Sequence, residues 1–257
     1  MSARRRLDAE MVRRGLVASR TEAQALIDAG SVTVAGAPAT KPARQVGPGD
    51  AIRVAGPRRR FVSRGGEKLD AGLEAFGLDV AGATVLDAGA STGGFTDCLL
   101  QRGASRVIAV DVGYGQLHEK LRADPRVTRI DRCNVRSITG DLVGAPFAVV
   151  VGDLSFISLT KVVEPLLSVC RAGASLVLLV KPQFEAGRQE VSKGRGIITD
   201  PTVRQRTLSE VTDAFQSAGA RVVASITSPI HGAEGNVEFL IHVVAPAVVA
   251  PTEPKDA

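Results

Sequence analysis

Two ionisable side chains stand directly after apolar segments of the sequence. Asp153 follows the apolar run of residues 148–152, and Lys181 follows the apolar run of residues 176–180. A charged group at the end of an apolar strand lies at the edge of a sheet, where a low dielectric constant strengthens its interactions. We therefore expect Asp153 and Lys181 to face each other in a catalytic site.

Two further ionisable residues lie in polar motifs, Lys68 in Arg-Gly-Gly-Glu-Lys and Glu238 in Gly-Asn-Val-Glu. Two lysines and two carboxylates can hold a weakly acidic hydroxyl in line for group transfer while it loses its proton. In such a site Lys181 would act as the base or stabilise the forming alkoxide, and the carboxylates would orient the lysines. The alternative is two ordinary ion pairs, Lys68 with Glu238 and Asp153 with Lys181.

A glycine-rich loop follows the predicted strand 83–87 and precedes a predicted helix. In an α/β sheet, this first turn lets the backbone approach a ligand. Asp111 ends the next predicted strand, 22 residues after Gly89, where a carboxylate can accept hydrogen bonds from both ribose hydroxyls. These features predict an adenosine-containing cofactor. Ser91 replaces the middle glycine of a dinucleotide-binding loop, which disfavours a pyrophosphate ligand.

Helices and strands are predicted to alternate along residues 61–245. The predicted helices are 65–77, 94–103, 115–122, 158–171 and 201–218, and the predicted strands are 83–87, 106–111, 127–131, 147–152, 174–180, 221–227 and 237–244. This alternation demands a largely parallel sheet with helices on both faces, which is the doubly wound, Rossmann-like α/β fold.

A small α+β unit is predicted for residues 1–56. It has a helix over residues 7–15, a second helix from Ser19 to about Gly30, and short strands near Val32 and Ile52. Residues 57–60 read as a linker between this unit and the α/β domain, and residues 246–257 as a Pro/Ala-rich tail.

Three motifs of the small unit, Arg-Leu-Asp, Gly-Leu-Val-Ala-Ser-Arg and Ala-Gly-Ser-Val-Thr-Val, resemble S4-like RNA-binding domains. The resemblance implies that a helical face contacts RNA phosphates, with Arg6, Arg14 and Arg20 as candidates. Each of the three could instead be an ordinary solvated arginine.

The charge distribution agrees with RNA binding by the small unit. Residues 1–60 hold 12 Lys/Arg and 5 Asp/Glu, a net charge of +7, whereas the rest of the chain carries −2. A solvated charged face is the alternative explanation, but a basic excess confined to one segment suits a module that binds a polyanion.

The sequence does not favour a membrane-spanning, exported or metal-binding protein. The apolar runs are shorter than the roughly 20 residues that cross a bilayer, and the N-terminus lacks a signal-peptide core, so we expect a cytoplasmic protein. The three cysteines and three histidines have no metal-binding spacing, and we predict no metal. The oligomeric state is unknown from the sequence.

The order Lys68, Asp153, Lys181, Glu238 resembles that of FtsJ-like RNA 2′-O-methyltransferases, and the glycine loop resembles that of S-adenosylmethionine-dependent enzymes. From Arg6 to about His242 the chain is similar to the TlyA type, also called haemolysin A. The motifs that carry this similarity are Val-Ser-Arg-Gly-Gly-Glu-Lys, Leu-Asp-Ala-Gly-Ala-Ser-Thr-Gly-Gly-Phe-Thr, Asp-Val-Gly-Tyr-Gly-Gln-Leu, Asp-Leu-Ser-Phe-Ile-Ser, Val-Lys-Pro-Gln-Phe-Glu and Gly-Asn-Val-Glu.

The resemblance implies a function and a set of site residues. The function is methylation of cytidine 2′-hydroxyls in 16S and 23S rRNA within 30S and 50S subunits, with S-adenosylmethionine as cofactor. Gly89, Ser91 and Gly93 would line the methionine end, Asp111 would hold the ribose, and Asn134 would face the adenine. The full set of expected cofactor-binding residues is Asp87, Gly89, Ala90, Ser91, Gly93, Gly94, Phe95, Asp111, Asn134 and Asp153.

Three other functions are less consistent with these motifs. Base amino-group methyltransferases carry Asn/Asp-Pro-Pro-aromatic after the fourth strand, whereas this chain has Asp-Leu-Ser-Phe from Asp153. A membrane-acting toxin would need an export signal or a membrane-binding segment, and an assembly factor would not need the four ionisable residues.

Aromatic residues are scarce in the sequence, but two follow the predicted catalytic strands. Tyr114 and Phe156 could border the methyl-transfer site and stack on the base of a flipped-out nucleotide. A buried core position for Phe156 is an equal alternative.

Overall fold

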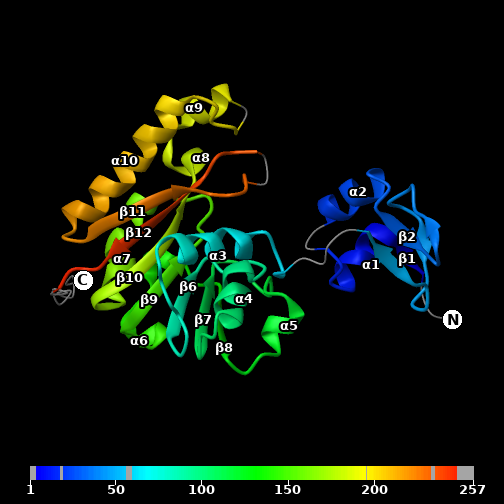
Figure 1. Cartoon of the computed structure of the whole chain (residues 1–257), viewed down its shortest axis with the longest axis horizontal. Helices are drawn as coiled ribbons and strands as arrows, with labels where there is room; N and C mark the ends of the chain where they lie inside the picture. The colour runs from blue at the N-terminus through cyan, green and yellow to red at the C-terminus, as the bar shows by residue number, and fades with distance from the viewer. Residues whose placement is uncertain (1–3, 18–19, 56–59, 195, 233–234, 248–257) are drawn as a thin grey trace. The chain divides into compact units, whose positions relative to one another are not determined.

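The computed structural model describes residues 4–17, 20–55, 60–194, 196–232 and 235–247 (Figure 1). The chain forms two compact units, Met1–Arg60 and Phe61–Ala257, and each has a hydrophobic core of its own. The predicted linker 57–60 lies outside the described residues except for Arg60, as does most of the predicted tail. The two units are therefore considered separately.

The small unit packs two helices against short strands. Its elements are β1 (Arg5–Arg6), α1 (Leu7–Arg13), α2 (Arg20–Asp28), β2 (Val32–Val34), β3 (Ala37–Pro38), β4 (Gln45–Val46) and β5 (Ile52–Val54). Strands β3, β2 and β5 form one antiparallel sheet, and β1 pairs with β4. Leu7 and Met11 lie four residues apart on α1, so both reach the core beside Ile27 and Val32. The two-residue strands are too short to show an alternating pattern in the sequence.

The large unit is built on a seven-stranded sheet with the order β11-β12-β10-β9-β6-β7-β8. Its strands are β6 (Thr84–Ala88), β7 (Arg106–Asp111), β8 (Val127–Asp131), β9 (Phe147–Gly152), β10 (Cys170–Val180), β11 (Arg221–Thr227) and β12 (Phe239–Val244). All pairs among β10, β9, β6, β7 and β8 are parallel, whereas β12 is antiparallel to both of its neighbours.

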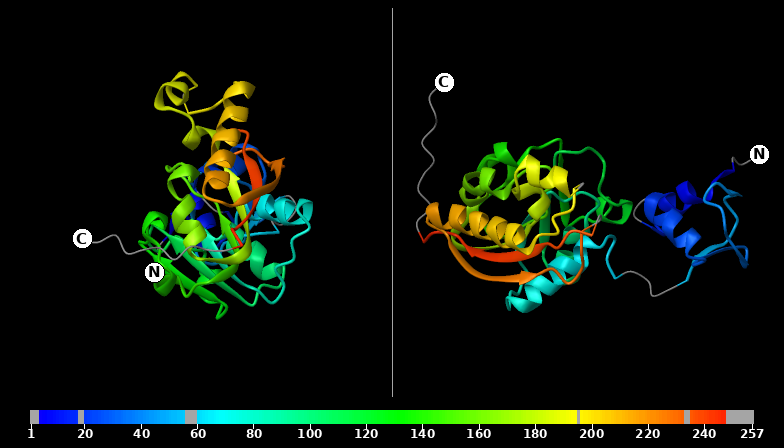
Figure 2. Two further views of the ribbon diagram at one scale, coloured as in Figure 1. Left: turned by 90° about the vertical axis from the view of Figure 1, so that its left-hand side faces the viewer. Right: turned by 90° about the horizontal axis from the view of Figure 1, so that it is seen from above.

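Helices cover both faces of this sheet (Figure 2). They are α3 (Gly65–Ala75), α4 (Gly94–Gln101), α5 (Glu119–Arg122), α6 (Gly140–Val143), α7 (Val163–Ser168), α8 (Pro182–Glu185), α9 (Arg188–Lys193) and α10 (Pro201–Ser217), with short 3-10 helices at Val135–Ser137 and Leu159–Lys161. Alternate residues of each strand point to opposite faces, so Val85 packs with α3 and α4 while Leu86 packs with α7 and α10. This is the doubly wound architecture that the alternation predicted.

Two predicted helices are shorter than expected. The helix predicted for 115–122 begins only at Glu119, because Gly115 has a φ of +65° and His118, with an extended ψ of 141°, is the N-cap residue. The helix predicted for 158–171 is interrupted, and the strand after it begins at Cys170. Pro165 lacks an N–H, and its ring would clash with the carbonyl four residues earlier, so it is tolerated only in the first turn of α7.

Candidate functional site

The side chains predicted to do chemistry lie along one edge of the large sheet. Gly152 pairs with Ala88 and Leu178, so Asp153 follows β9 beside the end of β6 and β10. Val180 pairs with Phe239 in the antiparallel β10–β12 ladder. Lys181 comes directly after Val180, and Glu238 comes directly before Phe239. Because β12 runs against β10, these two residues emerge at the same edge.

Lys181 is held by two oxygen atoms. Its Nζ lies 2.5 Å from Asp153 Oδ1 and donates a hydrogen bond to Ser155 Oγ at 2.9 Å. The Lys181 side chain is nearly buried, whereas Asp153 is partly open to solvent. The predicted pairing of Asp153 with Lys181 is therefore present, and Ser155 is an additional partner that the sequence motifs did not single out.

Lys68 and Glu238 form the second pair of the predicted set. Lys68 Nζ, on α3, donates to Glu238 Oε2, and both side chains are buried. A Cβ on Gly65 would lie 3.7 Å from Asp153 Oδ2, so the first turn of α3 reaches the other pair. Gly65 and Lys68 are three residues apart and share one helical face. The four residues thus form two ion pairs, as in the alternative interpretation, and both pairs lie at the same edge of the sheet.

The glycine loop between β6 and α4 packs tightly against two other segments. Gly89 has a φ of +85°, and a Cβ there would lie 2.8 Å from the Asp153 carbonyl oxygen. Gly93 has a φ of +94°, and a Cβ there would lie 2.2 Å from a methyl group of Leu121. Any larger residue would be strained and would clash at either position. The glycines therefore bring the loop into contact with the Asp153 segment.

Asp111 ties the loop after β6 to the loop after β7. Its Oδ2 accepts a hydrogen bond from Ser91 N at 2.8 Å, and its Oδ1 accepts one from Gly113 N at 2.7 Å. A carboxylate has about four acceptor sites. Asp111 therefore keeps about two acceptor sites for a ligand at the surface of the loop.

Asp87 is a second buried carboxyl near this edge, besides Glu238. It is fully buried at the end of β6, and its Oδ2 accepts a hydrogen bond of 2.6 Å from the Thr96 hydroxyl. Its Oδ1 has no hydrogen-bond partner among the residues that the structure describes. Burial raises the pKa of Asp87 to about 7, because the charged form loses its hydration, and the Thr96 hydrogen bond opposes this rise.

Other predicted cofactor residues have varied surroundings. Ala90, Gly94 and Phe95 are buried, and Phe95 packs in the core cluster around α3 and α4. The Phe95 side chain is therefore a packing residue, and the ligand contact of Phe95 stays a prediction. Asn134 is exposed after β8, and its Oδ1 accepts a hydrogen bond from Arg136 N.

The two predicted aromatic residues are exposed. Phe156 is 91% exposed, so the core position considered for it is wrong. Its ring centroid lies 5.1 Å from that of Phe184, in a tilted arrangement, and its φ is +64°. Tyr114 is 69% exposed, and the Arg132 guanidinium lies 4.5 Å above its ring. Phe184 and Arg132 are partners that sequence reasoning missed, because they lie in segments distant along the chain.

Glu185 connects the segment after Asp153 with the segment after Lys181. It follows Lys181 by one helical turn, and it accepts hydrogen bonds from Ser158 Oγ at 2.5 Å and from Leu159 N at 2.9 Å. Burial raises the pKa of Glu185, while these hydrogen bonds lower it. Glu185 therefore anchors the segment that carries Asp153 to the segment that carries Lys181.

The three predicted RNA-binding arginines differ in their surroundings. Arg14 donates to Glu10 and to the backbone oxygens of Gly47, Pro48 and Asp50, which occupies four of its five N–H groups. Its side chain is only 22% exposed. Arg14 therefore joins α1 to the turn before β5, and its RNA contact stays a prediction.

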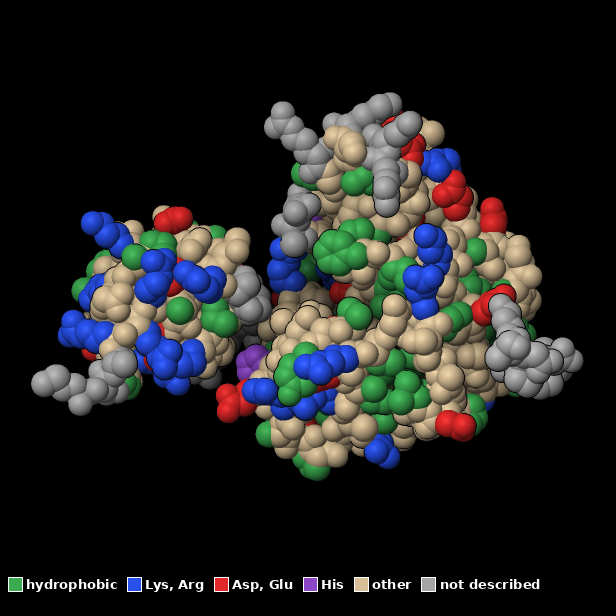
Figure 3. All heavy atoms as spheres, turned by 180° about the vertical axis from the view of Figure 1, so that it is seen from behind, with side chains coloured by type: hydrophobic (Ala, Val, Ile, Leu, Met, Phe, Trp, Pro, Cys, Tyr) green, Lys and Arg blue, Asp and Glu red, His purple; other side chains and the backbone are tan. Residues whose placement is uncertain are grey.

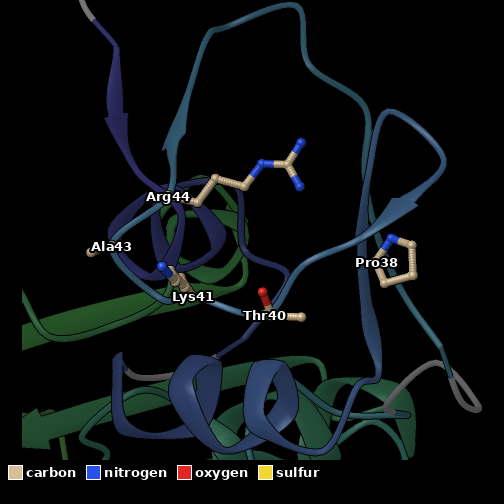
Figure 4. Close-up of a pocket in the computed structure, with 5 residues that line it drawn as sticks. All are labelled: Pro38, Thr40, Lys41, Ala43 and Arg44. Carbon is tan, nitrogen blue, oxygen red and sulfur yellow. The ribbon is translucent and has the colours of Figure 1, made fainter.

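Arg6 and Arg20 remain open to solvent, with side chains 44% and 57% exposed. In the space-filling view, Lys and Arg side chains are spread over the visible face of the small unit (Figure 3). A surface pocket of about 310 Å³ in this unit is lined by Pro38, Thr40, Lys41, Ala43 and Arg44 (Figure 4). The two cations of this pocket were not predicted, because they lie outside the helices.

Metal-binding and membrane-spanning features are not found among the described residues. No group of three or more His, Cys, Asp or Glu side chains in this part of the chain could hold a metal ion. No helix within the described ranges is long and apolar enough to cross a membrane.

Two protein-family models match the chain. The S4 domain model matches residues 5–52, and the FtsJ-like methyltransferase model matches residues 61–244. The class of this protein is therefore an FtsJ-like methyltransferase with an N-terminal S4 domain.

Individual relatives refine this class. A protein of Mycobacterium tuberculosis (strain CDC 1551 / Oshkosh), named 16S/23S rRNA (cytidine-2′-O)-methyltransferase TlyA, is 48% identical over 94% of this chain and 90% of its own length. Hemolysin A of Brachyspira hyodysenteriae is 42% identical over 93% of this chain and 99% of its own length. A solved structure of a candidate hemolysin from Streptococcus thermophilus has a TM-score of 0.77 at 38% identity, and the match covers 98% of this chain and 93% of that one. The chain belongs to the TlyA family of FtsJ-like methyltransferases, which confirms the resemblance seen in its motifs.

Proposed function

We propose that this protein methylates the 2′-hydroxyl of cytidine ribose in ribosomal RNA, with S-adenosylmethionine as the methyl donor. The observation that carries this proposal is the Asp153–Lys181–Ser155 arrangement beside the glycine loop, at the ends of β9 and β10. The nature of the acceptor follows from the relative of Mycobacterium tuberculosis, whose name states a cytidine 2′-O substrate.

The charges around the loop suit this cofactor. Asp87, Asp111 and Asp153 follow or end three adjacent strands, so a ligand with positive charge is favoured and a pyrophosphate is disfavoured. The two remaining acceptor sites of Asp111 match the two hydroxyls of a ribose. S-adenosylmethionine carries a sulfonium and an ammonium group and would supply an electrophilic methyl group at this edge.

Lys181 is suited to act on the attacking hydroxyl. An ammonium group has three N–H donors; one is donated to Ser155 Oγ, and Asp153 Oδ1 lies 2.5 Å from the nitrogen as its ion-pair partner. A remaining donor can point to the substrate oxygen and stabilise the negative charge that grows as the hydroxyl proton passes to solvent. Lys68 and Glu238 then complete the charge balance at the same edge of the sheet. This arrangement favours charge stabilisation by Lys181 over its action as the base.

The RNA substrate would be recruited by the small unit. Arg6 and Arg20 are exposed cations on its helical side, and Lys41 and Arg44 border the pocket beside β3 and β4. Cations on a rigid surface neutralise phosphates and fix the orientation of the RNA. We propose both 30S and 50S subunits as substrates, in the cytoplasm, since the relative of Mycobacterium tuberculosis is named for 16S and 23S rRNA.

The direct test is incubation of the purified protein with tritiated S-adenosylmethionine and separated 30S and 50S subunits that lack the modification. We expect label in the rRNA at a 2′-O-methylcytidine in both subunits, and none with Lys181→Met. Label on a base, or in protein alone, would overturn the proposed reaction. Label in one subunit only would overturn the dual specificity.

A further inference from the structure

A buried carboxylate in the small unit accepts hydrogen bonds from two arginines that lie in different elements. Asp8, in the first turn of α1, has a side chain that is 0% exposed. It accepts hydrogen bonds from Arg6 Nε at 3.1 Å and Nη2 at 2.9 Å. It also accepts hydrogen bonds of 3.1 Å from Arg20 Nη2 and from Gln24 Nε2, both on α2. Asp8 thus joins the end of β1, the start of α1 and the first turns of α2.

Both arginines keep free donors after this pairing. Arg6 gives two of its five N–H groups to Asp8 and Arg20 gives one, so three and four remain. The two side chains are 44% and 57% exposed, although the carboxylate beneath them is buried. One carboxylate and two guanidinium groups leave a net charge of +1. The cluster therefore presents two oriented guanidinium groups to solvent and still attracts an anion.

The neighbouring carboxylate Glu10 makes the contrast clear. Glu10 pairs with Arg13 and Arg14, and Arg14 also donates hydrogen bonds to backbone carbonyls. The Glu10 cluster is thus used to hold α1 to the rest of the unit. The Asp8 cluster differs because, in the described part of the unit, neither Arg6 nor Arg20 donates a side-chain hydrogen bond to any group other than Asp8.

We propose that Asp8 is a positioning residue for RNA binding, which acts by ordering Arg6 and Arg20 before the RNA arrives. This inference rests on the proposed function, since it assumes that the small unit binds RNA. A long side chain that is already held loses less conformational entropy on binding than a free one. The Arg6 hydrogen bonds also lower the pKa of Asp8, so this carboxylate stays charged under all ordinary conditions.

The direction in which Asp8→Asn changes the affinity for RNA distinguishes a positioning role from a purely electrostatic effect. Removal of a negative charge makes the unit more basic, so electrostatics alone predicts tighter RNA binding and a steeper salt dependence. Loss of the positioning carboxylate predicts weaker binding. The matched control is Asp28→Asn, which removes an exposed carboxylate from α2 in the same unit. We expect Asp28→Asn to leave binding unchanged or slightly tighter.

The experiment measures the affinity of the full chain for purified, unmodified 50S subunits between 50 and 200 mM KCl. We expect Asp8→Asn to weaken binding about tenfold, the equivalent of about 1.4 kcal/mol. An affinity that equals or exceeds that of Asp28→Asn would overturn the proposal. Circular dichroism melting and S-adenosylmethionine affinity check that the two units remain folded.

A second pair of variants keeps the test decisive if Asp8→Asn lowers the stability of the unit. The double change Arg6→Lys and Arg20→Lys keeps the charge but loses the forked pairing with Asp8. Positioning predicts weaker binding for this variant, and unchanged binding would contradict it. If Arg6→Ala with Arg20→Ala also leaves binding unchanged, the proposed RNA interface itself is misplaced. If only the alanine variant weakens binding, the interface stands and the positioning role of Asp8 fails.

Discussion

Ser91 donates its backbone N–H to Asp111 Oδ2 at 2.8 Å, and it does so from a φ of +48°. A non-glycine residue with positive φ is uncommon, and its conformation must be held by its surroundings. Asp111 therefore holds the glycine loop in shape, and we propose a second task, in which its remaining acceptors bind the ribose. The second task alone would be expected from the sequence.

The variant Asp111→Ala tests both tasks. We expect the binding of S-adenosylmethionine to weaken by roughly 1.5–3 kcal/mol, because charged hydrogen bonds to the ribose are lost. Isothermal titration calorimetry measures this change, with Asp124→Ala as the control, since Asp124 pairs with Arg126 at the far end of β8. Unchanged affinity for Asp111→Ala would refute its role in cofactor binding.

Lys181→Met removes the ammonium group that Asp153 and Ser155 hold. We expect methylation to fall by about 10²–10⁴-fold, while S-adenosylmethionine binds with nearly normal affinity. Single-turnover rates with saturating subunits measure the first effect, and calorimetry measures the second. The control is Lys161→Met, an exposed lysine in the short helix Leu159–Lys161. A rate within threefold of that control would exclude Lys181 from the chemistry.

The pKa of Asp87 predicts a pH dependence of stability. Its value is about 7 in the folded protein, against an ordinary value of 3.8, so the unfolded chain binds fewer protons between these values. The free energy of unfolding should therefore fall as pH rises through this window and level off above it. Between pH 5 and pH 8 the fall attributable to Asp87 is roughly 2–3 kcal/mol.

The variant Asp87→Asn isolates this contribution, because other titrating groups cancel in the comparison. Urea unfolding can be followed by fluorescence of Tyr114, the single tyrosine of the chain, which lies in the large unit. We expect the stability difference between the two proteins to change with pH by the amount given above. Parallel curves from pH 5 to pH 8 would show that Asp87 ionises normally in the folded state.

The positions of the ionisable residues at the edge of the sheet were easier to predict from the sequence than the contacts that these residues make. Asp153 and Lys181 follow apolar runs, so their positions were evident from local pattern. Glu238 was assigned from its polar motif and from the order of the four ionisable residues, because nothing local shows that β12 runs against its neighbours and brings Glu238 to the same edge. A strand of alternating apolar residues has no preferred direction until its partners are known.

The contacts that sequence reasoning missed join residues that lie far apart in the chain, or they involve backbone groups that no motif marks. Glu185 accepts a hydrogen bond from Ser158, 27 positions earlier in the chain. Arg14 donates hydrogen bonds to carbonyls more than 30 positions away. A backbone carbonyl is present at every residue, so no pattern marks which ones an arginine will find. The structural role of Arg14 was therefore not predictable from the sequence, and its RNA contact stays a prediction.

Deletion of residues 1–56 should separate cofactor binding from substrate recruitment. The hydrophobic core around the large sheet contains no residue of the small unit, so we expect the remaining domain to fold and to bind S-adenosylmethionine. Methylation of subunits should be lost, since most of the basic excess of the chain is removed. The assay is tritium transfer to 50S subunits at about 100 mM salt. Full activity of the truncated protein would show that the small unit does not recruit RNA.

Phe156 and Tyr114 offer the last test, which concerns the position of the target nucleotide. Phe156 is 91% exposed at a φ of +64°, a costly arrangement for a bulky side chain that contributes little to the core. We expect the target base to turn out of its helix and stack on this ring or on that of Tyr114.

Stacking of this kind contributes on the order of 1–3 kcal/mol per base, so Phe156→Ala and Tyr114→Ala should each lower methylation by roughly 5- to 150-fold. Subunit binding through the small unit should persist, which distinguishes a positioned base from general loss of affinity. The control is Leu142→Ala, because Leu142 is also an exposed apolar residue and lies in α6, before β9 begins. If both aromatic variants fold normally and methylate as fast as this control, the base does not rest on either ring. The exposure of Phe156 would then have no role in catalysis, and its contact with Phe184 would be the only function left for that side chain.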